Sequence, residues 1–256
     1  MTTLDARFGA ALADLCEEAA DLVRPLWKSG LVVDRKSDDS PVTEADRRAE
    51  TLILAGLARL APEVPVVSEE HASEFGAPGR IGRAFLLVDP IDGTKAFVRG
   101  DPNFTVNIGL IVDGVPVAGA ISAPATGETW FTTGQGVLKR INGGAAAPVR
   151  VRVWPEGAAI ALVSHTMKPQ TLQALADRYG FHGTDAMDSS IKFCRLAEGA
   201  ADIYPRHGPT MEWDIAAGHA ILAAAGGRVE AEDGGPFLYG KAKAGFLNGG
   251  FVARGG

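Results

Sequence analysis

Cysteine is scarce in this sequence: Cys16 and Cys194 are the only two among 256 residues. Two cysteines are too few for a disulfide framework, and no C-x-x-C spacing offers a zinc or redox site. Because this scarcity is typical of a reducing compartment, we expect a cytoplasmic protein.

Long apolar runs and excess positive charge are also missing. No apolar run reaches the roughly 18 residues of a membrane span, and residues 1–5 lack the pattern of a signal peptide. Acidic residues outnumber basic ones 31 to 25, which gives a net charge of −6 and does not favour sequence-independent nucleic-acid binding. We therefore expect no membrane and no nucleic-acid partner. An anionic ligand would have to bind where basic side chains create a local positive charge.

What is present is an ordinary globular composition, 46% hydrophobic and 22% charged. Apolar spacing predicts helices over residues 4–27 and from Thr43, where Asp46 completes a capping box, with a polar connector at 35–40 between them. Strands are expected at 64–67, 84–88, 105–112, 115–122 and 128–132, the later ones antiparallel, with Asp113-Gly114 as the hairpin turn between 105–112 and 115–122. From residue 160 strands and helices alternate: strand 160–164, helices 169–179 and 189–198, strand 201–204 and helix 214–225.

These elements predict an α/β protein with an α+β first half. The least structured segment, 142–148, places the boundary near residue 150. We therefore divide the chain into an N-terminal half, 1–150, and a C-terminal α/β half, 151–256.

The densest chemical signal is Asp89-Pro90-Ile91-Asp92-Gly93-Thr94, directly after a predicted buried strand. Two carboxylates at a strand end suit a hard cation, and the N–H groups of Gly93 and Thr94 could cradle a phosphate. The alternative is an Asx-turn in which Asp92 caps the next helix.

Glu69 and Glu70 end the preceding predicted strand, and Asp214 opens a helix far downstream. If Glu69, Asp89, Asp92 and Asp214 meet, their repulsion raises their pKa values unless cations neutralise them. Carboxylate oxygens without cysteine or a histidine pair favour Mg²⁺, with Mn²⁺ as the alternative.

Motifs along nearly the whole chain resemble the inositol monophosphatase superfamily of metal-dependent, lithium-sensitive phosphatases. They are Pro41-Val42-Thr43-Glu44-Ala45-Asp46, Ser68-Glu69-Glu70, Asp89-Pro90-Ile91-Asp92-Gly93-Thr94 and Trp213-Asp214-Ile215-Ala216-Ala217-Gly218. The resemblance implies a layered αβαβα sandwich of the sugar/inositol phosphatase type, with metals between its halves.

Further motifs resemble the bacterial 3′(2′),5′-bisphosphate nucleotidases of sulfur metabolism, which remove the 3′-phosphate of adenosine 3′,5′-bisphosphate. They are Lys95-Ala96-Phe97-Val98-Arg99-Gly100, Phe104-Thr105-Val106-Asn107-Ile108, Ser189-Ser190-Ile191-Lys192-Phe193-Cys194, Ala197-Glu198-Gly199, Asp202-Ile203-Tyr204-Pro205-Arg206 and Gly208-Pro209-Thr210-Met211-Glu212-Trp213-Asp214. The chain departs from that pattern at Leu162-Val163-Ser164-His165, which lacks an arginine before Ser164.

The resemblance implies two or three Mg²⁺ ions per site. Glu69, Asp89 and the carbonyl of Ile91 would hold one ion, and Asp89, Asp92 and Asp214 a second. Thr94, with Asp46 or Glu69, would orient and deprotonate the attacking water for in-line attack on the phosphorus. Asp46 is equally explained as a helix cap or as a group for catalysis or a third metal.

On the substrate side the resemblance implies roles for a set of polar residues. The N–H groups of Gly93 and Thr94 would bind the reacting phosphate, and Lys95 follows them. The nucleotide and its 5′-phosphate would contact His165, Ser189, Lys192 and Arg206. Each has an ordinary alternative: Lys192 on a solvated helix face, Ser189 as an N-cap, Arg206 in a surface ion pair and His165 in a loop.

Other readings of the same motifs stay open. A sibling phosphatase acting on inositol monophosphate, histidinol phosphate or fructose 1,6-bisphosphate would share the metal site. A non-catalytic regulatory protein could keep the fold, although intact acidic ligands speak against it. A homodimer is a further expectation, since dimers are common in the superfamily.

Overall fold

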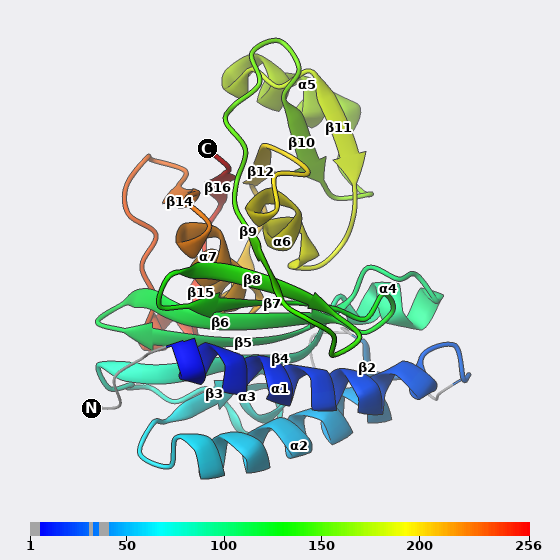
Figure 1. The fold of residues 1–256 in the computed structure, drawn as a ribbon, viewed down its shortest axis with the longest axis vertical. Helices are drawn as coiled ribbons and strands as arrows, with labels where there is room; N and C mark the ends of the chain where they lie inside the picture. The colour runs from blue at the N-terminus through cyan, green and yellow to red at the C-terminus, as the bar shows by residue number, and fades with distance from the viewer. Residues whose placement is uncertain (1–5, 31–32, 36–40) are drawn as a thin grey trace.

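The computed structural model describes residues 6–30, 33–35 and 41–256. Its elements stack in layers: a pair of helices, a seven-stranded sheet, two further helices, a five-stranded sheet and a last helix (Figure 1). This order confirms the predicted α/β class and the αβαβα sandwich.

The first layer consists of α1 (Ala6–Val23) and α2 (Glu44–Leu60), packed against one face of the large sheet (Figure 1). Pro25 ends the α-helical pattern, and a short 3-10 turn, η1 (Arg24–Leu26), follows. The predicted capping box forms, because the Thr43 hydroxyl accepts from Ala45 N–H while Asp46 Oδ2 accepts from Thr43 N–H. The predicted residues 4 and 5 of the first helix lie outside the described chain.

The large sheet has the order β3-β4-β5-β6-β7-β8-β9. Its first two strands are parallel and the rest antiparallel. The strands are β3 (Val66–Ser68), β4 (Ala84–Asp92), β5 (Thr105–Val112), β6 (Val115–Ala123), β7 (Glu128–Thr133), β8 (Gly136–Ile141) and β9 (Ala147–Val149). As predicted, Asp113 and Gly114 form the hairpin turn between β5 and β6, both with positive φ, so the sequence pattern placed this connection correctly.

The middle layer contains α6 (Ile191–Ala197) and α7 (Glu212–Ala224). Helix α7 lies directly on β5 and β6, because Gly109 and Gly119 present no side chain to it. A Cβ built on Gly109 would stand 2.7 Å from the backbone nitrogen of Ala217, and one on Gly119 would stand 2.7 Å from its carbonyl oxygen. This close approach holds the middle of α7 against the sheet, and the first turn of the helix, with Asp214, lines the same cavity as Asp89 and Asp92 of β4.

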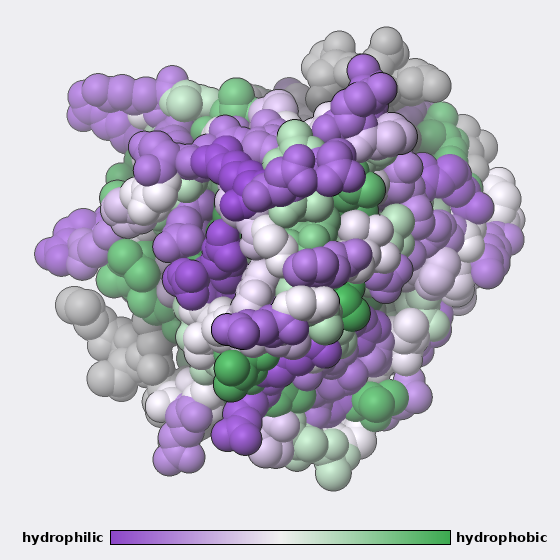
Figure 2. Space-filling model, turned by 90° about the horizontal axis from the view of Figure 1, so that it is seen from above, coloured by the Kyte–Doolittle hydropathy of each residue, from purple (hydrophilic) through white to green (hydrophobic). Residues whose placement is uncertain are grey.

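The second sheet has the order β11-β10-β12-β16-β14, and helix α5 (Pro169–Tyr179) covers its outer face. Its strands are β10 (Ile160–Val163), β11 (Gly183–Ala186), β12 (Ile203–Arg206), β14 (Arg228–Ala231) and β16 (Phe251–Arg254). Viewed from this end, the surface is largely hydrophilic with scattered apolar side chains (Figure 2). None of the helices in the described residues is long and apolar enough to cross a membrane.

Several local predictions need correction. The first residue of the predicted polar connector, Arg35, ends β1 (Val33–Arg35), which pairs with β2 (Pro41–Thr43), while connector residues 36–40 lie outside the described chain. The loop at 142–148 includes the start of β9, and Glu69 begins helix α3 (Glu69–Phe75) instead of ending a strand. These elements are short, and a few residues carry too little periodicity to be recognised from sequence.

Four more elements complete the described part of the chain. They are β13 (Thr210–Met211) paired with β15 (Leu247–Asn248), and a 3-10 turn, η2 (Ala242–Ala244). Helix α4 (Thr94–Arg99) follows β4 directly. The division of the chain near residue 150 stays a prediction.

Candidate active site

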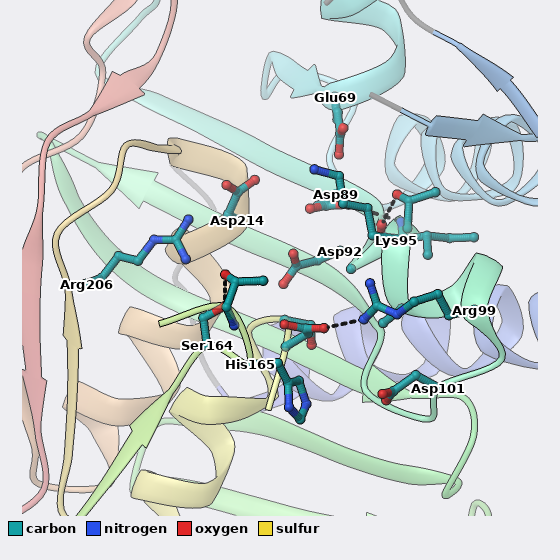
Figure 3. Close-up of a pocket in the computed structure, with 17 residues that line it drawn as sticks. Glu69, Asp89, Asp92, Lys95, Arg99, Asp101, Ser164, His165, Arg206 and Asp214 are labelled. Carbon is teal, nitrogen blue, oxygen red and sulfur yellow. Dashed lines mark hydrogen bonds and ion pairs between the residues drawn. The ribbon is translucent and has the colours of Figure 1, made fainter. Parts of the chain in front are cut away.

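A cavity of about 670 Å³ lies where the end of β4 meets the second half of the chain. Figure 3 shows Glu69, Asp89, Asp92 and Asp214 around its centre, with Arg206 on one side and Lys95 and Arg99 on the other. Its lining includes Glu69, Asp89, Ile91, Asp92, Gly93, Thr94, Lys95, His165, Ser189, Arg206 and Asp214. The structure therefore brings nearly all of the predicted site residues into one cavity.

The end of β4 is irregular, and this irregularity aims two carboxylates into the cavity. Asp89 pairs with Asn107 and Asp92 with Thr105, with a shift of register between them. Asp89 Oδ1 accepts from the N–H of Ile91 at 3.1 Å, which is a local turn. Asp92 does not cap the next helix, because Gly93 occupies that position and Asp92 Oδ2 accepts instead from the backbone N–H of Ser190. The capping alternative for Asp92 is therefore wrong.

Gly93 makes the sharp turn from β4 into α4. Its φ of +91° lies in the region that favours glycine, and a Cβ there would stand 2.9 Å from the carbonyl oxygen of Asn103. A side chain at this position would strain the backbone beside Asp92. The turn leaves the backbone of Gly93 and Thr94 on the cavity wall.

Glu69 reaches the cavity from the first turn of α3. Strand β3 runs parallel to β4, with Ser68 opposite Val88, so the residue after Ser68 lies beside Asp89. Glu50 of α2 accepts from the N–H groups of Glu70 and His71 and so satisfies the start of α3. The carboxylate of Glu69 points toward Asp89 (Figure 3).

Asp214 comes from the opposite side of the cavity, on α7. It is the third residue of this helix and not its first, and its Oδ2 accepts from the N–H of Met211 at 2.8 Å. Asp214 is therefore not the N-cap residue, but it satisfies the N–H of the residue that is, and the cavity lining also includes Asp214. The same side chain can thus support the helix and face the cavity.

The acidic cluster is electrostatically unfavourable without a counter-charge. Burial raises the pKa of Asp89 well above its usual range, and the charges of Glu69, Asp92 and Asp214 raise it further. Burial likewise raises the pKa of Asp214, with added repulsion from Asp92 and Glu69. Burial also raises the pKa of Asp92, although Lys192 and the N–H of Ser190 partly oppose this. Such a group of oxygen donors suits a divalent hard cation.

The carboxylates line the cavity without forming a complete metal-coordination site. Within residues 6–30, 33–35 and 41–256, no three Asp, Glu, His or Cys side chains are yet arranged to hold one ion. Metal binding would therefore require inward rotation of some of these side chains. The donor chemistry fits Mg²⁺, and a bound cation would relieve the repulsion among these carboxylates.

Asp46 uses its two oxygens differently. Oδ2 accepts from both the N–H and the hydroxyl of Thr43, at 2.8 and 2.6 Å, whereas Oδ1 lies 3.4 Å from the Thr94 hydroxyl. The Thr94 hydroxyl also donates to the carbonyl oxygen of Ile91 at 3.0 Å. Asp46 is thus a helix cap that also faces Thr94 at the edge of the cavity.

Lys192, like Asp46, is a predicted residue that does not line this cavity. It is 3% exposed, so the alternative of a solvated helix face is wrong. Its Nζ donates to the carbonyl oxygens of Met187 and Ser189, and it lines a smaller cavity of about 90 Å³ together with Arg206 and Thr210. Burial lowers its pKa to about 8, against the opposing charge of Asp92.

Three charged residues of the cavity wall were not among the predicted site residues. Arg99, Asp101 and Asp188 line its mouth, and Arg99 forms an ion pair with Asp188 at 2.7 Å (Figure 3). Arg99 could have been found, because it lies four residues after Lys95 and so on the same side of a helix. Nothing in the sequence marks Asp188, which joins the site only because the chain folds back beside β4.

Sequence and structure comparisons agree with this geometry. The chain is 39% identical over 242 residues to the 3′(2′),5′-bisphosphate nucleotidase CysQ of Salmonella typhimurium, covering 94% of this chain and 96% of that protein. It is 34% identical over 237 residues to the histidinol-phosphatase of Mycobacterium tuberculosis, covering 90% and 88%. The crystal structure of CysQ from Bacteroides thetaiotaomicron superposes with a TM-score of 0.78 at 33% identity, covering 98% and 97%.

The family profile spans the whole site. The inositol monophosphatase family matches residues 6–249, which include both the acidic cluster and the residues at the cavity mouth. The ordered motifs, the layered fold and the convergent carboxylates have one explanation: the chain belongs to the inositol monophosphatase family.

Proposed function

We propose that this protein hydrolyses the 3′-phosphate of adenosine 3′,5′-bisphosphate, giving adenosine 5′-monophosphate and phosphate. The observation that carries the proposal is a cationic subsite next to the acidic cluster. Arg206 and Lys192 line the smaller cavity, which Asp92 and Asp214 also border. A substrate with two phosphates could place one near the carboxylates and the other near these cations.

Two hydrogen-bond donors in this region could bind a ligand. The Thr210 hydroxyl and Arg206 Nε are buried and have no hydrogen-bond partner among the described residues. Buried donors of this kind are costly unless a ligand or water satisfies them. A phosphate is a suitable acceptor, since an arginine binds it in a charge-assisted contact. Lys192 would contribute its positive charge without a direct hydrogen bond to the phosphate, because its Nζ already donates to two carbonyl oxygens.

We further propose that the activity requires Mg²⁺. Glu69, Asp89 and the Ile91 carbonyl would hold one ion, and Asp89, Asp92 and Asp214 a second, with a third near Asp46 as an option. When bound, the metal would neutralise the phosphoryl oxygens and lower the pKa of the attacking water.

The protein's own groups would do the positioning. The Thr94 hydroxyl would orient the attacking water, and the Asp46 carboxylate, 3.4 Å from it, or Glu69 would accept the proton. The N–H groups of Gly93 and Thr94 would bind the reacting phosphate. Lys95, His165 and Ser189 line the same cavity and would contact the rest of the nucleotide.

A panel of phosphate esters tests this function. Phosphate release should be greatest from adenosine 3′,5′-bisphosphate and should stop when a chelator removes the metal. The panel also contains adenosine 3′-monophosphate, inositol 1-phosphate, histidinol phosphate and fructose 1,6-bisphosphate. A preference of orders of magnitude for any of the last three would replace the nucleotidase proposal with that activity.

A variant at the cationic subsite sharpens the test. Arg206→Ala should lower kcat/KM for the bisphosphate by about ten- to a hundredfold, since a charged hydrogen bond contributes about 1.5–3 kcal/mol. Hydrolysis of adenosine 3′-monophosphate, which lacks the second phosphate, should be nearly unchanged. Equal losses on both substrates would show that Arg206 supports the fold or the acidic cluster instead.

The 34% identity to a histidinol-phosphatase keeps that activity as the second candidate. A non-catalytic role would require turnover of every ester in the panel to be absent. The cytoplasmic location and the homodimer expected from the sequence stay predictions.

A further inference from the structure

An ion pair crosses the mouth of the cavity between two distant parts of the chain. Arg99 is the last residue of α4, and its guanidinium contacts the carboxylate of Asp188, just before α6, at 2.7 Å (Figure 3). Both side chains line the cavity. The pair therefore lies in the same cavity as the acidic cluster, where a phosphorylated substrate would bind.

Asp188 is held in place by its neighbours. The carbonyl oxygens on either side of it, those of Met187 and Ser189, both accept from the buried Nζ of Lys192, at 3.1 and 2.7 Å. Ser189 has a φ of +61°, which is unusual for a residue with a side chain and indicates a tightly determined backbone. Asp188 is thus a fixed negative charge at the entrance of a site for anions.

Arg99 is held less tightly. Its side chain is 54% exposed, against 24% for Asp188, and α4 ends immediately after it at Gly100. An exposed ion pair of this kind is weak in water. A phosphate offers the guanidinium a better partner, because it carries up to two charges and accepts two parallel hydrogen bonds.

We propose that Arg99 is a substrate-binding residue and that Asp188 holds it at the cavity mouth until a nucleoside phosphate displaces the carboxylate. Lys95 lies one helical turn before Arg99 and lines the same wall, so both cations face the path of the ligand. Asp188 thereby competes with the substrate for Arg99. This inference rests on the proposed phosphatase function but not on its preference for a bisphosphate.

Calorimetric titration with adenosine 5′-monophosphate in the presence of Mg²⁺ tests the competition without requiring turnover. Asp188→Asn should tighten binding about two- to fivefold, because it removes the competitor of an exposed pair. Arg99→Gln should weaken binding about tenfold, the value of one charged contact. The double variant should match Arg99→Gln within about twofold, since Asp188 acts through Arg99.

Asp101→Asn is the matched control. Asp101 also lines the cavity mouth, but its carboxylate accepts from the N–H and side chain of Asn103 and not from Arg99. Its neutralisation should change binding less than Asp188→Asn does. If Asp101→Asn tightens binding equally, or if Asp188→Asn still tightens it in the Arg99→Gln background, the effect is only general charge and the inference is wrong.

Three further outcomes would also contradict the inference. Weaker binding in Asp188→Asn would show that Asp188 braces the site, and unchanged binding in Arg99→Gln would show that the ligand does not touch Arg99. A wild-type protein that binds no adenosine 5′-monophosphate would overturn the inference as well. The phosphate-release panel judges the proposed function separately, because it measures turnover.

Discussion

Ser190 donates its backbone N–H to Asp92 Oδ2 at 2.5 Å, although the two residues are 98 positions apart in the chain. The Ser190 hydroxyl donates to Asn107 Oδ1 at 2.9 Å and lies 2.9 Å from the hydroxyl of Thr105. Asn107 and Thr105 belong to β5, opposite Asp89 and Asp92 of β4. Ser190 therefore joins the substrate side of the cavity to the strand that carries its carboxylates.

Ser190→Ala should lower the free energy of unfolding by about 1–3 kcal/mol, because it removes the hydroxyl that donates to the buried Asn107 and leaves Thr105 with only the longer contact to the Ser189 hydroxyl. Urea unfolding monitored by circular dichroism measures this loss. Ser29→Ala, which removes an exposed hydroxyl that donates to the Leu26 carbonyl, is the control and should cost much less. Equal losses in the two variants would contradict the joining role of Ser190.

Two substitutions separate the two roles of Asp46. Asp46→Asn keeps an oxygen for Thr43 but loses the charge that faces Thr94, so activity should fall about 100-fold or more while stability changes little. Asp46→Ala should lose the same activity and, in addition, about 0.5–2 kcal/mol of stability through the missing cap. Phosphate release and thermal melting of the purified variants measure the two effects. If Asp46→Asn retained full activity, Asp46 would act only as a helix cap.

Asp89 links stability to pH when no metal is present. Its folded pKa is raised well above the usual value of 3.8 by burial and by Glu69, Asp92 and Asp214. As pH rises above 3.8, the unfolded chain releases this proton while the folded protein retains it, so stability falls until the raised pKa is passed. In chelator, Asp89→Asn should therefore melt at a higher temperature than the wild type at pH 8, but not at pH 4.

The same variant should lose activity by more than about 100-fold, since even outer partners of a metal site contribute 10–100-fold. Added Mg²⁺ should stabilise the wild type at pH 8 and stabilise Asp89→Asn less. Asp177→Asn, on the exposed side of α5, controls for the loss of a carboxylate elsewhere. If Asp89→Asn melts at a lower temperature at both pH values in chelator, Asp89 is a structural residue and not part of a repulsive cluster.

Glu128 should show the opposite pH dependence. Burial tends to raise its pKa, but hydrogen bonds from Arg195 and Lys139 outweigh burial and lower the pKa to about 2. Its contribution is therefore complete above pH 4.5 and is lost as pH falls toward 2. Glu128→Gln should cost about 1.5–3 kcal/mol at pH 7, as for a charged hydrogen bond.

Urea unfolding of wild type and Glu128→Gln between pH 2 and pH 7 measures this difference, which should shrink toward pH 2. Glu230→Gln is the control, because its ion pair with Arg228 is exposed at the surface. A difference that stays constant over the whole range would mean that Glu128 acts through its shape and not its charge.

The sequence alone determined the elements with strong local signals. The period of the first helix, the capping box at Thr43 and Asp46, and the turn at Asp113-Gly114 depend on neighbouring residues, so they could be predicted with their positions. The ordered motifs around Glu69, Asp89 and Asp214 identified the family because their spacing and order are rarely shared by chance. The short strands β1 and β9 were not predicted, because a strand of three residues shows almost no alternation of apolar and polar side chains.

The contacts that the predicted residues make depend on the tertiary structure and could not be predicted from the sequence. Lys192 looks like a surface lysine in sequence, yet the fold buries it beneath Ser189, where its ammonium binds backbone carbonyl oxygens. The pairing of Arg99 with Asp188 depends on two segments 89 residues apart meeting at one cavity mouth. Such contacts arise from the packing of α7 and α6 on the large sheet, and no local pattern encodes them.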